Sequence, residues 1–321
     1  MLANAINEEA SYYSEELRYL HTDPVLGAAV ATLSSPHEIS NGELMAAVEP
    51  LFADTSWLSQ AGRRWVAHLS AGAFHYPPVP GGLADGGTDV IKTALIFKNE
   101  RAIISLQSFD SAALALTRNR LAVADYVVLT GRTTIMAVVN EGSVSCELLQ
   151  FEALNRDTDL DQPLEVHGTT RVELDRGSGP LTSDGRSTAV RYLSSQGDPL
   201  ILSVTVMADA LPYRCTVATD SGRIGEVKAA RDHDNMARTG MTLLRQLGDD
   251  SRGDALLKFF GHEAHFVRWH AMREYAALRG TDAIPELQSA LAAETSPYLA
   301  RAIDRLIEAL RALIEDQAKC L

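Results

Sequence analysis

Short segments rich in β-branched residues, separated by turn-forming residues, fill the chain from Val90 to about Arg231. The turn sequences include NEG at 140–142, SDG at 183–185 and GDP at 197–199. Short strands at this spacing predict an antiparallel β-sandwich or barrel for the middle of the chain. Typical segments are TALIFKN, RAIISLQ, TIMAVVN, VSCELLQFE and LILSVTV.

Helical patterns flank this β region on both sides. In the N-terminal part, Ser40 and Glu43 have the spacing of a capping box ahead of apolar residues at helical intervals. The segment PPVPGGLADGGTD contains three prolines and four glycines, which neither a helix nor a central strand tolerates, so it is expected to be a linker. The expected organisation is a helical N-terminal region at 1–76, a linker at 77–89, a β domain at 90–235 and a helical domain at 236–321.

The formal charge of −13 at pH 7 opposes binding to nucleic-acid phosphates, which requires clustered Lys and Arg. No run approaches the roughly 18 apolar residues of a membrane span, and the acidic N-terminus does not fit a secretory signal. The three cysteines, Cys146, Cys215 and Cys320, are widely separated and fit neither a disulfide framework nor a zinc motif. We expect an acidic cytoplasmic protein that binds neither nucleic acid nor membrane.

The clearest helical pattern lies near the C-terminus. Ser296 can cap a helix that has Pro297 in its first turn. Apolar residues then recur at intervals of four and three, which predicts an amphipathic helix that buries one face. These residues are Leu299, Ile303, Leu306, Leu310 and Leu313.

Residues 241–315 resemble a pair of HEAT-type repeats, in which a "VR..A...L" helix precedes an "..IP.L...L" helix. The matching residues are Val267, Arg268, Ala271 and Leu278, then Ile284, Pro285, Leu287 and Leu291. The resemblance implies stacked α-hairpins that present helical faces to protein partners, in a homo- or hetero-oligomer. Two such units need a further surface to pack against.

The β region has a weaker resemblance to the cupin superfamily, carried by its strand pattern and by the turn VVLTG at 127–131. The resemblance implies a jelly roll with metal ligands from an HxH…E motif and a later histidine. In this register the motif positions hold Arg118, Arg120 and Asp125, and the later position holds Thr188. The usual metal-binding histidines are therefore missing.

An arginine cannot ligate a cation, so this register predicts an anion site in place of a metal site. Two arginines spaced i and i+2 on one strand face, with Asp125 nearby and Arg191 opposite, could clamp a carboxylate or phosphate. Thr188 completes this predicted ligand-binding set. The alternative is that Arg118 and Arg120 lie in a solvated loop and that the register is wrong.

Two groups of histidines have compositions that could suit a metal ion. The sequence HEAH at 262–265, followed by His270, lacks the HExxH spacing of zincins and indicates surface or helix-capping histidines. His68, His75 and His167 could converge as a noncanonical site for Fe(II) or another divalent transition metal. No cofactor is otherwise predicted.

The sequence therefore predicts an α+β multidomain protein: N-terminal helices, a central antiparallel β-sandwich or barrel of cupin-like jelly-roll type, and C-terminal HEAT-like α-hairpins. The expected function is that of a noncatalytic or regulatory binding protein, with a metal-free pocket for a small anionic ligand or peptide and a helical docking surface. One alternative is a cupin-class enzyme, either a metal-dependent oxygenase or a metal-free isomerase or lyase. Another is a structural subunit of a hetero-oligomer.

Overall fold

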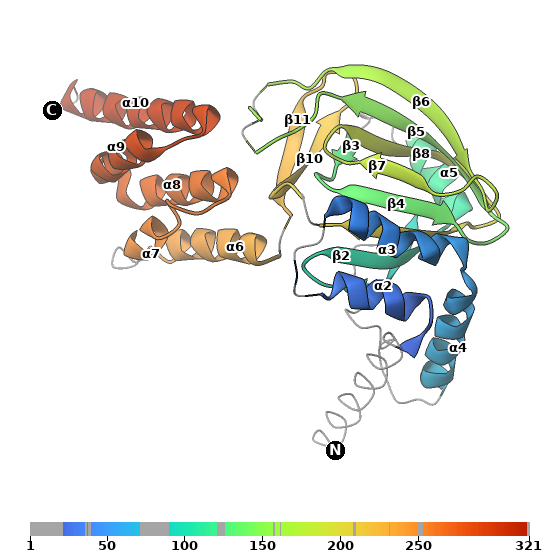
Figure 1. Ribbon diagram of the computed structural model, residues 1–321. Helices are drawn as coiled ribbons and strands as arrows, with labels where there is room; N and C mark the ends of the chain where they lie inside the picture. Colours follow the sequence, from blue (N-terminus) through green and yellow to red (C-terminus); the bar gives the residue numbers. More distant parts are fainter. Residues whose placement is uncertain are drawn as a thin grey trace. The chain divides into compact units, whose positions relative to one another are not determined.

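Figure 1 shows the computed structural model of the protein. It describes residues 22–35, 37, 40–70, 90–120, 126–156, 158–160, 162–207, 210–230, 232–248 and 253–319, without the side chains of 41, 64–70, 117–120, 232 and 315–319. Contacts divide the chain into two compact units. One, the helical unit, combines residues 153–164, 211–217 and 221–321, and the rest forms the β unit.

Two antiparallel sheets form the centre of the β unit. The larger sheet has the strand order β1-β2-β9-β4-β7, and the smaller has the order β6-β5-β8. The strands of the larger sheet are β1 (Ile91–Lys98), β2 (Ala102–Phe109), β9 (Leu200–Val206), β4 (Thr133–Val138) and β7 (Leu181–Asp184). Those of the smaller sheet are β6 (Val166–Leu174), β5 (Ser143–Phe151) and β8 (Thr188–Gln196).

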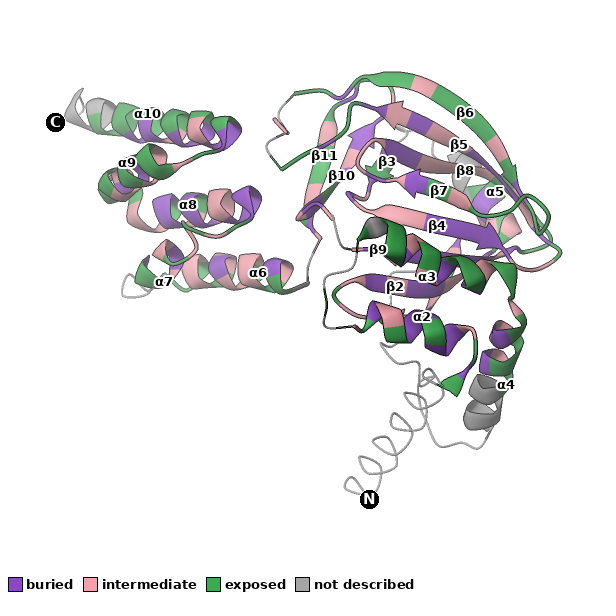
Figure 2. Ribbon diagram, viewed as in Figure 1, coloured by how far each residue is buried: buried purple, intermediate pink, exposed green. Residues whose placement is uncertain are grey.

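Helices cover one face of the larger sheet. They are α2 (Leu26–Leu33), α3 (Asn41–Ala53) and α4 (Ser56–Ser70). Leu26, Leu44 and Trp57 from these helices share a buried cluster with Ile104 and Val204 of the sheet. The N-terminal helices therefore belong to the core of the β unit (Figures 1 and 2).

The other face of the larger sheet packs against the smaller sheet. Phe109 and Ile201 of the larger sheet share a buried cluster with Val144, Cys146 and Leu174 of the smaller one. Successive side chains of a strand point to opposite faces, so β-branched residues at consecutive positions fill both cores. The β unit is thus built of three layers: helices, sheet and sheet.

Two further elements contact β8. They are the strand β3 (Tyr126–Leu129) and the helix α5 (Ser111–Arg120). Helix α5 begins where the Asp110 carboxylate accepts a hydrogen bond from the Ala113 amide at 2.8 Å. Neither sheet closes into a barrel within the described residues, so the jelly roll predicted from the cupin resemblance is not confirmed.

The helical unit contains one β-hairpin and a stack of helices. The hairpin consists of β10 (Tyr213–Ala218) and β11 (Ile224–Ala229). Helix α8 lies between α6 and α10 and contacts both, whereas α7 and α9 connect them (Figure 1). The helices are α6 (Asp232–Gln246), α7 (Gly253–Leu257), α8 (His265–Arg279), α9 (Ile284–Ala293) and α10 (Pro297–Lys319), with a 3₁₀ turn at Gly280–Ala283.

Long-range contacts tie strand residues to the helices of the helical unit. Tyr213 of β10 packs edge-on against His265 and Phe266, at ring-centroid distances of 5.6 and 6.2 Å. Its hydroxyl donates to the Asn155 carbonyl at 2.7 Å. The segment 153–164 and the β10–β11 hairpin therefore group with the helices.

Several local predictions are confirmed. Ser40 and Glu43 form the capping box of α3, and the Ser296 hydroxyl accepts from the Leu299 amide at the start of α10. The HEAT-type motif residues lie in two consecutive helices, α8 and α9, but the HEAT repeat itself stays a prediction. No described helix is both long enough and apolar enough to span a bilayer.

Candidate partner-binding surface

The structure describes only some of the side chains of the predicted anion site. Arg118 and Arg120 lie at the end of α5, where the cupin register requires a strand, and their side chains are outside the described residues. Asp125 is also outside them. The two arginines therefore do not share a strand face, because the local backbone is helical.

Thr188 and Arg191 both lie on β8 but have different partners. The Thr188 hydroxyl donates to Gln150 Oε1 at 3.1 Å, and Arg191 Nε donates to Glu147 Oε2 at 3.0 Å. Residues three apart on a strand point to opposite faces. The structure therefore does not bring these two side chains together, and Arg191 already has a carboxylate partner on β5.

The alternative metal ligands are placed only in part. His167 is an exposed residue of β6, the side chain of His68 on α4 is outside the described residues, and so is the whole of His75. Within the described part of the chain, no three His, Cys, Asp or Glu side chains are placed to share a metal ion. Whether these three histidines converge stays a prediction.

The histidines of the HEAH segment serve the helical unit in separate ways. His262 Nδ1 accepts from the Ala264 amide at 3.1 Å, which leaves the ring proton on Nε2, 3.5 Å from the buried carboxylate of Asp234. His265 is buried, with Phe266 and Tyr298 at edge-on ring distances of 6.0 and 5.9 Å. Helix α8 has no side-chain cap, and His262 bonds only to the amide of the N-cap residue Ala264, so the capping role predicted for these histidines is not confirmed.

His270 faces α6 and takes part in the contacts between α6 and α8. Its Nε2 lies 3.0 Å from the Thr242 hydroxyl and 3.1 Å from the Arg238 carbonyl. Burial, followed by the positive charge of Arg238, lowers the pKa of His270, so the ring is neutral at pH 7. Next to it, Arg245 of α6 pairs with Glu274 of α8.

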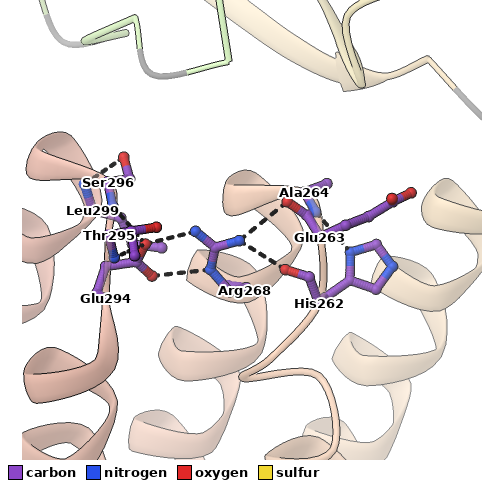
Figure 3. Close-up of polar contacts among 8 residues, drawn as sticks. All are labelled: His262, Glu263, Ala264, Arg268, Glu294, Thr295, Ser296 and Leu299. Carbon is purple, nitrogen blue, oxygen red and sulfur yellow. Dashed lines mark hydrogen bonds and ion pairs between the residues drawn. The ribbon is translucent and has the colours of Figure 1, made fainter.

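A second polar network joins the α7–α8 turn to the α9–α10 turn (Figure 3). Arg268 donates to Glu294 through Nε at 2.9 Å and through Nη2 at 2.6 Å. Its Nη1 donates to the His262 and Glu263 carbonyls at 2.7 and 3.1 Å. The side chains of Arg268 and Glu294 are only 14% and 3% exposed, so this ion pair is largely shielded from water.

Glu294 is held ionised in this network. Burial opposes its ionisation, but hydrogen bonds from Arg268 and from the Ser296 and Thr295 amides outweigh burial and lower its pKa below the ordinary 4.5. The amides lie 2.8 and 3.0 Å from Glu294 Oε1. The two networks fix α6, α8 and α10 in a row, because each links neighbouring helices of the stack.

The outer side of α6 carries an exposed apolar row. Met236 and Leu243 of α6, and Leu247 in the turn directly after it, are 69%, 53% and 67% exposed. The Leu247 amide still donates to the Leu243 carbonyl at 2.9 Å, so the helical spacing extends to this residue. The three apolar residues recur at intervals of seven and four and therefore fall on one side of the helix, opposite the side on which Arg245 bonds to α8. We call Met236, Gly240, Leu243 and Leu247 the α6 row.

The opposite end of the stack has a different surface. The exposed residues of α10 are mixed. The charged ones, of both signs, are Arg301, Asp304, Arg305, Glu308 and Arg311. Near its C-terminus the helix also exposes Leu313 and Ile314, at 55% and 45%, so the prediction that Leu313 lies on the buried face is wrong.

A recess of about 480 Å³ opens on the helical unit beside α9. Leu257, Phe260, Ala290 and Ala293 are among the residues that line it. Its lining also includes Glu286, Ser289 and Thr295, and Arg268 and Glu294, which are bonded to each other, so the recess is mixed in polarity.

No protein-family model matches this chain, and no curated protein is similar to it in sequence. A function therefore has to be argued from the described residues themselves. The sequence predictions missed the α6 row, although its apolar spacing of seven and four resembles that recognised in α10. The HEAT-type motif includes Arg268, but the motif did not indicate that the side chain of this residue joins two turns.

Proposed function

We propose that this protein is a noncatalytic binding protein whose helical unit, a short HEAT-like array, docks an apolar helix of a protein partner along α6. The α6 row carries the proposal. Three large apolar side chains, each more than half exposed, are aligned on one helix face, and exposed apolar surface of this kind is typical of interaction sites.

The contrast between the two ends of the stack supports the choice of α6. Stacked helical repeats need a polar outer face on the terminal helix, because an apolar end would remain in contact with water. Five exposed residues of α10 are charged, and its exposed Leu313 and Ile314 are confined to its C-terminal part, whereas the exposed residues of the α6 row carry no charge. The α6 end is therefore the better suited of the two to receive another helix.

Gly240 in the middle of the row indicates how closely that helix approaches. A glycine within a helix costs roughly 0.5–1 kcal/mol relative to alanine. A Cβ built on Gly240 meets no atom of the described chain within 4 Å, so packing within the described residues does not require the glycine. A partner helix that crosses α6 at Gly240 would account for it, since small residues allow helices to approach closely.

The small-anion pocket expected from the cupin resemblance has no comparable support, because Arg191 is paired with Glu147 and Thr188 points to the other face of β8. A subunit of a hetero-oligomer remains as a second candidate. The α6 row favours it equally, since permanent interfaces are also apolar. The two differ in whether the isolated chain is stable in solution.

Thiol labelling of Met236→Cys in a Cys320→Ser background tests whether the row is open. We expect maleimide to label this cysteine at nearly the rate of a free peptide, and to label the control Leu116→Cys, at an exposed position of α5, at a similar rate. Slow labelling at 236 combined with fast labelling at 116 would mean that the chain itself covers the row, which contradicts docking there. Aggregation of the isolated wild-type chain would favour the hetero-oligomer.

A further inference from the structure

Glu286 is a carboxylate without a bonded partner in the helical unit. It lies in the first turn of α9 and lines the recess beside this helix. Within the described residues it forms no hydrogen bond or ion pair, and its Oε2 is also shielded from solvent. An oxygen that has lost water without gaining a donor is uncommon in folded proteins, and a bound ion is one physical reason for it.

The other two charges in the lining of the recess neutralise each other. Arg268 donates to both carboxylate oxygens of Glu294 and, through Nη1, to two turn carbonyls (Figure 3). This pair is saturated with partners and offers little charge to a ligand. Among the described residues that line the recess, Glu286 therefore carries the one unpaired charge, and its sign is negative.

The charges near Tyr275 do not change this balance. Burial, followed by the negative charge of Glu286, raises the pKa of Tyr275, so the carboxylate lies near this hydroxyl. Arg279 and Asp254 also act on Tyr275, but with opposite signs. The charge of Glu286 remains in excess, and the recess favours a cation.

The size and walls of the recess suit a small ligand with an apolar part. Its volume of about 480 Å³ lies within the range of about 300–1,000 Å³ that is typical of small-molecule pockets. Leu257, Phe260, Ala290 and Ala293 contribute apolar surface next to the carboxylate. A ligand that fills this space would place a positive group at Glu286 and an apolar chain along these walls.

The carboxylate geometry selects one kind of cation. A metal ion needs several ligands, and within the described residues no three His, Cys, Asp or Glu side chains are placed to share one. A guanidinium bonds a carboxylate through both oxygens, whereas Oε2 of Glu286 is shielded. An ammonium group is a compact charge that a single oxygen can bind.

We propose that the recess beside α9 binds a primary ammonium group carried on a short apolar chain, with Glu286 as the carboxylate that receives it. The ligand is a free amine or a lysine side chain, since both have this chemistry. The proposal concerns the recess alone and does not depend on the α6 row.

Ligand-observed saturation-transfer NMR on the full chain, at physiological ionic strength, tests the proposal with n-hexylammonium as the probe. We expect saturable binding in the millimolar range, and weaker binding of n-hexanol and hexanoate, which keep the chain but not the positive charge. Nα-acetyl-lysine methylamide distinguishes the two sources. Binding of this compound as well assigns the recess to a lysine side chain, and binding of n-hexylammonium alone assigns it to a free amine.

Two variants connect the binding to the recess. Glu286→Gln keeps the shape of the side chain and should weaken n-hexylammonium binding by at least about tenfold. Ala290→Phe fills the recess, leaves the carboxylate in place and should also abolish binding. The control Glu308→Gln removes the same charge from an exposed position of α10 and should bind as the wild type does.

Four results would overturn the proposal. The first is the absence of saturable n-hexylammonium binding, and the second is equally tight binding of n-hexanol. The third is a Glu286→Gln variant that binds as well as the wild type. The fourth is an equal loss in Glu308→Gln, which would mean that the net charge of −13 attracts the amine without a specific site.

Discussion

Replacing Arg268 with methionine tests the ion pair that joins the hairpins of the helical unit. Methionine keeps much of the apolar stem but removes the guanidinium, which donates to Glu294 twice and to two turn carbonyls. Removing one partner of a buried ion pair costs about 3–5 kcal/mol because the remaining charge stays buried. Glu294 keeps the Ser296 and Thr295 amides as donors, so we expect the lower end, about 3 kcal/mol.

The assay should report on the helical unit alone, because the two units can unfold separately. Native-state hydrogen exchange, followed by mass spectrometry on peptides from α8 and α10, gives this resolution. Arg268→Met should lower the hydrogen-exchange protection factors of the α8 and α10 peptides by about two orders of magnitude, which corresponds to about 3 kcal/mol. The protection of peptides from β2 and β9 should be unchanged. The control Arg311→Met, exposed on α10, should stay within about 0.5 kcal/mol of wild type.

The pH dependence of the same pair has a definite sign. The folded-state pKa of Glu294 lies below the unfolded value near 4.5, so its ionisation stabilises the fold above pH 4.5. That contribution falls as the pH drops through the folded-state pKa. The stability difference between wild type and Glu294→Gln should therefore shrink over this pH range. A difference that stays constant down to pH 3 would refute the reasoning. A loss of unfolding free energy below 1 kcal/mol in Arg268→Met would refute it as well.

Three further predictions follow from the described contacts. Because burial and Arg238 lower the folded-state pKa of His270 below the ordinary 6.5, the helical unit should lose stability as the pH falls below 6.5, and His270→Gln should flatten this slope in exchange measurements. Burial raises the thiol pKa of Cys146 to about 11 and of Cys215 to about 12, so both should resist Ellman's reagent at pH 8 until urea unfolds the chain. Gly240→Ala should stabilise the helical unit by roughly 0.5–1 kcal/mol. Gly222 has φ +67°, and a Cβ at this position would lie against the Leu164 carbonyl oxygen. Gly222→Ala should therefore lower the free energy of unfolding, measured by chemical denaturation, by more than about 1 kcal/mol.

Local signals in the sequence were sufficient for much of the secondary structure. The Ser40–Glu43 capping box and the Ser296 cap involve residues three apart, so their chemistry can be read without knowledge of the fold. The strands were recognisable because β-branched residues fit a sheet that is buried on both faces.

The grouping of elements depended on long-range contacts that no local pattern encodes. Nothing near Tyr213 in the sequence indicates that its ring packs on His265, about fifty residues later, and so assigns β10 to the helical unit. The apolar stripes of the N-terminal helices likewise predict a buried face, but they do not indicate that this face packs on the larger sheet.

The arginines of the predicted anion site were assigned to a strand because the register taken from the cupin resemblance was preferred to the helix propensity of the local sequence. The segment SAALALTRNR consists largely of good helix formers after the capping residue Asp110, yet the cupin register treated its arginines as strand residues. The α6 row was overlooked because exposed apolar residues are identifiable only once the buried face of the helix is known.

The most direct test of docking on α6 is photo-cross-linking in the cells from which the protein comes, with a photoreactive amino acid in place of Leu243 and, as control, in place of Leu116 on α5. The account predicts an adduct with another protein at 243 only, mapped to an apolar helix of that protein and abolished by Gly240→Leu. Adducts confined to this chain's own residues, or adducts that are equal at both positions, would contradict it.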